Sequence, residues 1–273
     1  MDSNILKSPE DARDWKYSEL SNIDNLSLPK KLDLRKKLKP VRNQGGTRSC
    51  VAFAAACIKE YQEYKNNGLM EYMSPLFIYN NRSNTGTTGM YSRDLFRILS
   101  NIGVVAEKDY SIKKHYNDIS IPKELLEKAE NFKISGYARI YTTEELKMAL
   151  YKNGPCQVVL PDYTPFGVEF WKKYKEDQPL LGGHDVVCVG YDDEKRKFIL
   201  RNSKGKNWGD RGYTYIDYDE YEKVMWETWT IIDDESSIRI KDYLYEDQYF
   251  KRFLLFLRKI LGYILWKEEW IYY

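Results

Sequence analysis

The order of local patterns along this chain limits its fold more than any other feature of the sequence. Helix-type segments come first, at residues 50–61, 74–79, 92–101, 122–131 and 143–152. Short β-type runs separated by turns follow, at residues 156–160, 185–191, 197–202, 212–216 and 229–232. Helices followed by strands are typical of an α+β protein, here one built from two lobes.

Composition narrows the class of protein and of ligand. Among 273 residues, 42% are hydrophobic and 31% are charged, which excludes a wholly disordered chain, a collagen-like repeat and a multi-span membrane protein. The formal net charge is only +2, so no strong field recruits nucleic acid. The sequence has only two histidines and lacks a Cys-x-x-Cys pair, which argues against a metal site. It also lacks the Gly-rich phosphate loop of a nucleotide-binding protein. We therefore expect no nucleic-acid partner, cofactor or metal.

The distribution of polar segments and expected helices and strands divides the chain into three parts. Residues 1–27 are polar and irregular, and we expect a tail or a wrapping arm. Residues 28–235 form the main domain, with a helical lobe at roughly 44–135 and a β lobe at roughly 136–235. Residues 236–273 form an extension in which 249–266 is an amphipathic helix too interrupted by charge to span a membrane. That helix docks on the main domain, mediates self-association or lies at a membrane surface.

The chain start and the cysteines predict a compartment. The first seven residues are polar and lack the apolar run of a secretory signal. The four cysteines then suit reduced thiols, so we expect an intracellular, cytosol-like location. Association with a membrane surface or a virion is left open.

Cys50 is the first candidate for chemistry. A turn-rich loop containing Gly45 and Gly46 leads into the helix that begins at Cys50, with Ser49 or Thr47 as its expected cap. A nucleophilic thiolate needs an electropositive setting, and a helix N-terminus supplies part of it. The loop N–H groups and the amide of Gln44 are the kind of donors that an oxyanion hole needs. The alternative is that Cys50 is a small residue of the core.

A base for this thiol has few candidates. His115 lies in a polar run typical of a solvated loop, whereas His184 follows two glycines and opens an apolar strand. His184 is therefore the candidate base, although a core histidine would fit the same pattern. Asn202 ends the next strand, where its amide can hold the imidazole in its working tautomer.

Three segments together resemble the papain-like cysteine peptidases. They are QGGTRSCVAF at residues 44–53, GHDVVCVGY at 183–191 and NSKGKNWGDRGY at 202–213, in the order and spacing of that family. The resemblance covers roughly residues 28–233 and implies the papain-like two-lobed α+β fold, with a central helix starting at the nucleophile. Thr47 stands where secreted members carry a disulfide cysteine, so the chain resembles the disulfide-poor bacterial or viral type.

The resemblance also implies a reaction. Cys50 is the nucleophile with a lowered pKa, His184 is the general base and later acid, and Asn202 orients His184. Gln44 and the backbone N–H of Cys50 form the oxyanion hole. The implied activity is that of an endopeptidase that cleaves a peptide or protein substrate through a Cys50 acyl-enzyme, without a cofactor. Alternatives are a weakly active or inactive peptide-binding protein and an acyl transferase.

Five further positions are expected to contact substrate by the same resemblance. Gly89 matches the glycine edge that pairs with extended substrate, with an ordinary turn glycine as the alternative. Arg48 lies beside the nucleophile and favours the thiolate or an acidic substrate residue, unless it is simply solvated. Asp185 borders the main specificity pocket and favours a basic side chain. Gly183, beside His184, and Lys204 complete the set.

Lys204 and the short tail are departures from the family pattern. Lys204 stands where the family has a tryptophan that shields the Asn–His hydrogen bond. We expect a wetter bond at that position, a cation that opposes protonation of His184, and modest activity. About 27 residues precede residue 28, too few for the family's inhibitory helical propeptide. Either the enzyme is made active, or the tail or the C-terminal extension covers the site.

Overall fold

The computed structural model describes residues 5, 7–9, 11, 14–20, 27–115 and 120–232. Its α-helices are α1 (Tyr17–Leu20), α2 (Cys50–Asn67), α3 (Pro75–Asn80), α4 (Ser92–Asn101), α5 (Ile112–His115), α6 (Lys123–Ala129), α7 (Thr143–Lys152) and α8 (Tyr218–Val224), with 3-10 turns η1 (Arg35–Lys37) and η2 (Glu130–Phe132). Its strands are β1 (Lys31–Asp33), β2 (Gly136–Ile140), β3 (Cys156–Asp162), β4 (Gly182–Asp192), β5 (Lys197–Arg201), β6 (Tyr213–Asp217) and β7 (Glu227–Ile232).

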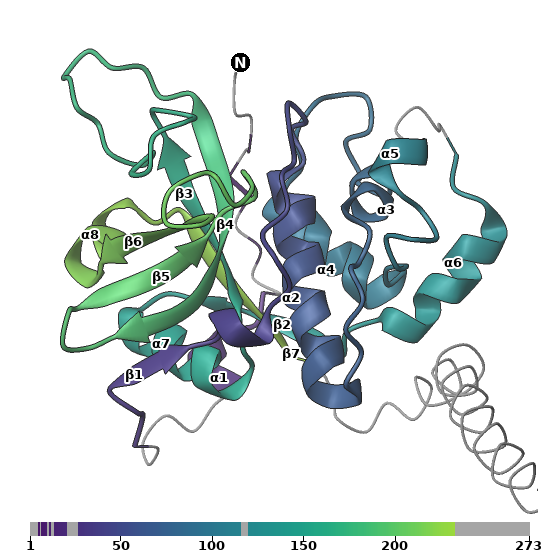
Figure 1. Ribbon diagram of the computed structural model, residues 1–273, viewed down its shortest axis with the longest axis horizontal. Helices are drawn as coiled ribbons and strands as arrows, with labels where there is room; N and C mark the ends of the chain where they lie inside the picture. Colours follow the sequence, from purple (N-terminus) through teal and green to yellow (C-terminus); the bar gives the residue numbers. More distant parts are fainter. Residues whose placement is uncertain are drawn as a thin grey trace, which may run out of the picture. The chain divides into compact units, whose positions relative to one another are not determined.

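The predicted α+β architecture is confirmed. Helices α2 to α6 gather on one side and the sheet with α7 and α8 on the other (Figure 1). The helix predicted at 143–152 has the bounds of α7 and begins with a capping box, in which Thr142 accepts from the Glu145 N–H and Glu145 accepts from the Thr142 N–H. Strand β2 and helices α1, α5 and α8 were not predicted, because four to seven residues carry too little periodicity.

One antiparallel sheet organises the second half of the chain. Its strand order is β2-β7-β3-β4-β5-β6, and β1 also pairs with β4. Strand β4 is 11 residues long and carries a register shift between Cys188 and Gly190, which lets it pair with β3 and β5 along different stretches. Only Asp185 separates His184 from the core residue Val186, so the candidate base and the core are adjacent at the start of β4.

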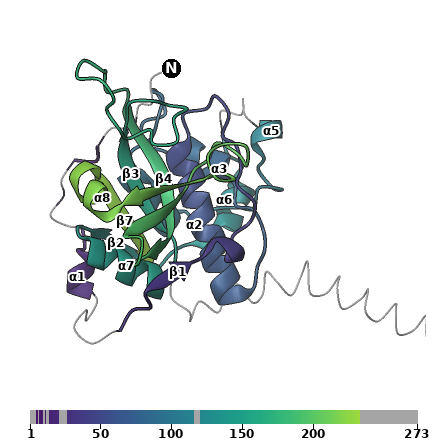
Figure 2. The same cartoon turned by 60° about the vertical axis from the view of Figure 1, so that its left-hand side comes forward.

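Helix α2 lies against this sheet. Every residue from Cys50 to Glu63 is buried, and α2 contacts β4 and β3 (Figures 1 and 2). Small side chains in its first turns permit this close approach. Two charged residues lie within this buried surface, Lys59 and Glu63. They form an ion pair with each other at 2.7 Å, so each buried charge has a partner. The first residue of α2 is thereby fixed beside the start of β4.

Described residues of the N-terminal segment are docked on the rest of the fold. Ile5 forms an antiparallel bridge with Gly183, and Asp14 forms an ion pair with Arg93 of α4 at 2.5 Å. The Arg139 N–H of β2 donates to the carbonyl of Trp15 at 2.8 Å. The expectation of a wrapping arm therefore fits these residues, which contact both the helical side and the sheet.

Two sequence-based expectations concern the chain's relation to membranes. Among the residues that the structure describes, no helix is long and apolar enough to cross a membrane. The amphipathic helix predicted at 249–266 lies outside the described residues.

Candidate active site

Cys50 is the first residue of α2 and is 6% exposed. Ser49 is the N-cap residue, but its side chain makes no capping hydrogen bond. The Thr47 hydroxyl donates its proton to the carbonyl of Gln44 at 2.7 Å. The Ser49 hydroxyl therefore donates to the Thr47 hydroxyl oxygen, also at 2.7 Å. Ser49 is thus the N-cap residue, as predicted, but it caps the helix without a side-chain hydrogen bond, which leaves the first backbone N–H groups of α2 without a capping side chain.

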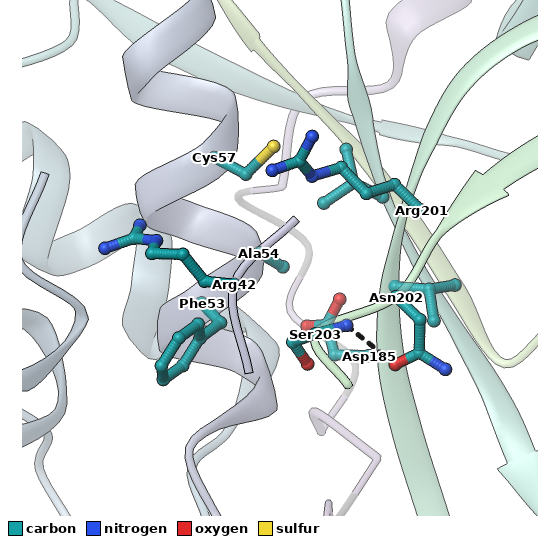
Figure 3. A pocket seen from close by; sticks show the side chains of 10 residues that line it. Arg42, Phe53, Ala54, Cys57, Asp185, Arg201, Asn202 and Ser203 are labelled. Atoms are coloured by element: carbon teal, nitrogen blue, oxygen red, sulfur yellow. Dashed lines mark hydrogen bonds between the residues drawn. The ribbon is translucent and has the colours of Figure 1, made fainter. Parts of the chain in front are cut away.

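His184, near the start of β4, lies next to Asn202, which directly follows the neighbouring antiparallel strand β5. The His184 Nε2 atom lies 2.8 Å from Asn202 Oδ1. The same Oδ1 atom accepts the backbone N–H of Ser203 at 2.7 Å, which fixes it as the oxygen of the amide (Figure 3). Nε2 of neutral His184 must therefore carry the proton and donate. Nδ1 is left with a free lone pair, which is the tautomer that a base toward the thiol requires.

Gln44 is tied to the same region by three hydrogen bonds. Its backbone N–H donates to the Ser203 carbonyl at 2.8 Å, and the Ser203 hydroxyl donates to Gln44 Oε1 at 2.5 Å. Gln44 Nε2 donates to the Thr47 carbonyl at 2.7 Å. The amide is buried and held in one orientation, so one N–H is committed to the loop that precedes Cys50 and the other proton is free for a second acceptor.

The resting charges differ from those expected by resemblance. Burial raises the pKa of the Cys50 thiol to about 12, with a smaller contribution from the charge of Asp185. The backbone N–H groups of Asp185 and Val51 act in the opposite direction by hydrogen bonding to the sulfur. Burial, followed by the charge of Lys204, lowers the pKa of His184 to about 4. The direction for Cys50 is therefore opposite to the lowered thiol pKa expected by resemblance, and both shifts favour the neutral forms of the two groups.

The surroundings of Lys204 also correct one expectation. His184 and Asn202 are each only 3% exposed, so their hydrogen bond is dry. Phe170 packs edge-on against His184 at 5.0 Å between ring centres and is itself buried. The Lys204 ammonium lies 5.2 Å from the ring centre of Phe166. Phe170 thus covers the His184 ring, and the charge of Lys204 lowers the pKa of His184, in the predicted direction.

Arg48 and Gly89 are brought together by the loop before α4. Arg48 Nη1 donates to the hydroxyl of Thr88 at 3.0 Å. Gly89 has a φ of 83°, and its N–H lies 3.3 Å from the Tyr79 hydroxyl that accepts it. Asn84 donates weakly to its carbonyl at 3.4 Å. Substrate pairing at Gly89 remains a prediction, since both of its backbone groups have partners within the loop.

A small cavity lies between α2, the start of β4 and the end of β5. It measures about 20 Å³, and Asp185, Asn202 and Ser203 line its sheet side. Figure 3 shows the guanidinium of Arg201 beside the sulfur of Cys57, one helical turn or more beyond the Cys50 end of α2. No group of three His, Cys, Asp or Glu side chains among the described residues is placed to hold a metal ion.

Comparison with known proteins decides the family. Residues 28–232 match the family described as papain family cysteine protease, which is most of the chain. The chain belongs to the papain family. Membership agrees with the resemblance of the three segments around Cys50, His184 and Asn202.

Curated members of the papain family show the same likeness over part of their length. Chymopapain of Carica papaya is 29% identical over 213 residues, which is 74% of this chain and 57% of chymopapain. Cathepsin K of Mus musculus is 32% identical over 202 residues, covering 69% of this chain and 60% of the relative. The chain thus spans less than two thirds of the length of these relatives.

Solved structures of the papain family share the fold. Xylellain, a cysteine protease from Xylella fastidiosa, has 28% sequence identity and a TM-score of 0.72, covering 84% of this chain and 95% of xylellain. Digestive procathepsin L 3 of the Tenebrio molitor larval midgut has 21% identity and a TM-score of 0.62, covering 77% and 71% of the two chains.

One acidic residue near the papain-family site was missed by the sequence analysis. Glu227 opens β7 and is 1% exposed, as is Asp185. Its Oε1 accepts the backbone N–H of Ser8 at 2.6 Å and its Oε2 accepts Trp229 Nε1 at 3.0 Å. A glutamate at the start of a strand-type run, followed by Thr and Trp, was the available signal, because an acid is rare inside a buried strand.

Proposed function

We propose that this chain hydrolyses peptide bonds through an acyl-enzyme on Cys50. The observation that carries the proposal is the fixed tautomer of His184. Asn202 holds the Nε2–H, so Nδ1 can take the thiol proton, and α2 presents Cys50 beside the start of β4 that carries His184.

The acylation step follows from this arrangement. Cys50 Sγ attacks the substrate carbonyl carbon while its proton passes to His184 Nδ1, forming a C–S bond and a tetrahedral oxyanion. The free N–H of Gln44 and the backbone N–H of Cys50 are the donors proposed to stabilise that oxyanion. Collapse breaks the C–N bond, and the imidazolium gives its proton to the departing amine. Asn202 stabilises the imidazolium by accepting from Nε2 throughout.

Deacylation reuses the same groups. His184 removes a proton from water while the water oxygen bonds to the thioester carbon, and collapse of the tetrahedral oxyanion breaks the C–S bond as the imidazolium returns its proton to the departing sulfur. The products are a carboxylic acid, which loses its proton to solvent, and the regenerated thiol. Because the resting pair is neutral, proton transfer accompanies attack instead of preceding it. Burial disfavours the charged forms of both Cys50 and His184, so transfer of the proton during attack costs less free energy than prior formation of a thiolate.

Two finer points belong to the same proposal. The substrate is a peptide or protein, as papain-family membership indicates. A reducing, cytosol-like compartment is proposed on the ground that all four cysteines are free and buried thiols. Domain limits at residues 28 and 235 remain predictions.

Mass spectrometry of epoxide labelling tests the proposal. A peptidyl epoxide of the E-64 type should add once to the full chain, and Cys50→Ala should abolish the adduct. Cys57→Ala is the matched control, because Cys57 is a buried thiol on the same helix. A peptide library should then show cleavage that Cys50→Ala and His184→Ala both remove.

The opposite results have distinct meanings. An adduct that forms on the Cys50→Ala chain, or one that is lost in the Cys57→Ala chain, would refute the assignment of Cys50 as the nucleophile. An adduct on Cys50 without library cleavage would favour the peptide-binding alternative. Products that carry an added amine in place of water would favour the acyl transferase.

A further inference from the structure

The loop between Gln44 and Cys50 is closed by hydrogen bonds in place of a disulfide. Thr47 stands where secreted members of the papain family carry a disulfide cysteine, and all four cysteines of this chain are free thiols. Two exposed glycines, Gly45 and Gly46, come before Thr47, and Gly45 has a φ of 64°. Glycine adopts this left-handed conformation readily, but it leaves the backbone more freedom than any other residue. The position of Gln44 relative to Cys50 therefore depends on contacts made by the side chains of the loop.

Thr47 and Gln44 hold each other through hydrogen bonds in both directions. The backbone N–H of Thr47 lies 3.4 Å from the carbonyl oxygen of Gln44, which is long for a bond of this type. The Thr47 hydroxyl donates to the same carbonyl at 2.7 Å and so closes the turn. In return, Gln44 Nε2 donates to the Thr47 carbonyl at 2.7 Å. Without the hydroxyl, the carbonyl of Gln44 would keep only the long backbone contact with Thr47.

The same hydroxyl connects this turn to helix α2. The Thr47 hydroxyl oxygen accepts the proton of the Ser49 hydroxyl at 2.7 Å. Ser49 is the N-cap residue of α2 and directly precedes Cys50, and both Ser49 and Gln44 are buried. One hydroxyl group thus joins two places in the chain. The first is Gln44, which carries the proposed side-chain donor to the oxyanion, and the second is the residue before Cys50, which carries the proposed backbone donor.

The rate of acyl transfer is sensitive to the spacing of these two donors. Both must lie at hydrogen-bond distance from the position that the oxygen takes in the tetrahedral intermediate. A displacement of about 1 Å can cost on the order of 100-fold in rate. The Ser203 hydroxyl holds Gln44 Oε1 from the side of the sheet. Thr47 supplies the second point of attachment, which fixes the amide of Gln44 relative to α2.

We propose that Thr47 is a positioning residue of the reaction, and that its hydroxyl holds the Gln44 side-chain donor and the Cys50 backbone donor at the spacing that the oxyanion requires. This inference deepens the proposed peptidase function and rests on it for the oxyanion. Thr47 acts through Gln44 and Ser49, so loss of its hydroxyl slows acyl transfer and leaves the reactivity of the Cys50 thiol unchanged.

Steady-state kinetics of Thr47→Val in the full chain test the proposal. Valine replaces the hydroxyl by a methyl group and keeps the branched shape of threonine. The substrates are the p-nitrophenyl ester of N-acetylglycine, which requires only acyl transfer, and the peptide that the parent chain cleaves best in the library. Thr47→Val should lower kcat about tenfold and leave KM within about twofold, because the oxyanion forms after substrate binding. Thr47→Ser restores the hydroxyl and should recover most of the lost kcat.

Alkylation by iodoacetamide separates positioning from damage to the site. The Cys50 sulfur displaces iodide from a saturated carbon in this reaction, so no oxyanion forms. The alkylation rate and its dependence on pH should therefore be the same in Thr47→Val and in the parent chain. Ser49→Ala removes only the bond that joins Thr47 to α2 and should lower kcat less than Thr47→Val does. The double variant should fall no further than Thr47→Val, because both changes break one network.

Thr87→Val is the matched control. The Thr87 hydroxyl donates to the carbonyl of Asn84, three residues earlier, at 3.2 Å. This contact has the same form as that between Thr47 and Gln44, but it lies in an exposed turn outside the proposed oxyanion site. Thr87→Val should leave kcat unchanged. Thermal unfolding of each variant identifies any chain that fails to fold, and if Thr47→Val is such a chain, the kcat of Ser49→Ala decides.

Several results would overturn the positioning role while the peptidase function stands. These are a kcat of Thr47→Val equal to that of the parent chain, an equal fall in Thr87→Val, a parallel fall in the alkylation rate, or no recovery in Thr47→Ser. A fall in ester turnover by Thr47→Val, with no peptide cleaved by the parent chain, would uphold the positioning role and overturn the peptidase function. Alkylation of Cys50 without turnover of ester or peptide by the parent chain would overturn both.

Discussion

Replacing Lys204 by methionine should raise the pKa of His184. Burial and the Lys204 charge, in that order, lower this pKa from 6.5 to about 4. Because burial is the larger cause, we assign Lys204 about one pKa unit, or ~1.4 kcal/mol. The methionine side chain keeps the contact with the Phe166 ring while removing the charge. Desolvation of His184 is then unchanged, so the charge effect is isolated.

The rate of Cys50 alkylation against pH reports this shift. The sulfur reacts when neutral His184 takes its proton, so the rate falls as pH drops through the pKa of His184. The midpoint of that fall should move from about pH 4 in the parent chain to about pH 5 in Lys204→Met. The difference should shrink in 1 M salt, because Lys204 is partly exposed.

Lys206→Met is the control, since Lys206 is an exposed cation of the same loop. An unchanged midpoint in Lys204→Met, a downward shift, or an equal shift in Lys206→Met would refute the electrostatic reasoning. An alkylation rate that follows a thiol pKa, with no dependence on position 204, would show that the resting pair is ionised.

Three further outcomes are expected. Phe170→Ala should lower the free energy of unfolding by about 3–5 kcal/mol in urea and Phe170→Leu by less than about 1.5 kcal/mol, and equal losses would contradict the packing against His184. The free energy of unfolding should fall by about 3 kcal/mol between pH 6.5 and 4, because His184 of the unfolded chain takes up a proton at a higher pH than His184 of the folded chain. His184→Gln should remove this dependence of the unfolding free energy on pH. Asp14→Ala, which breaks the pair with Arg93, should speed epoxide labelling of Cys50 severalfold, whereas Glu19→Ala, in an exposed pair with Lys16, should not.

Long, periodic elements and the ordered motifs were predictable from the sequence. The helix at 143–152 was placed residue for residue, because its capping signal and apolar spacing agree. The proximity of Gln44, His184 and Asn202 followed from three motifs far apart in the chain. Their hydrogen bonds then fix an orientation of Asn202 that no linear pattern contains.

Burial and long-range contacts were not predictable in the same way. The pKa values of Cys50 and His184 depend on how closely α2 approaches β4, which local sequence does not state. Phe170, which covers the His184 ring, comes from the segment between β3 and β4 and not from the segment that carries Lys204. The pairing of Glu227 with Ser8 joins residues 219 positions apart, so only the fold brings it about.

The adjacent residues Asp14 and Trp15 hold opposite sides of the molecule, through Arg93 of α4 and Arg139 of β2. The same segment also reaches the sheet beside His184, because Ile5 bridges Gly183 and Ser8 donates to Glu227. Linkage is reciprocal. A ligand that binds only when Gly183 and Glu227 are uncovered would therefore favour release of the segment from Arg93 and Arg139, and release of the segment would favour that ligand by the same factor.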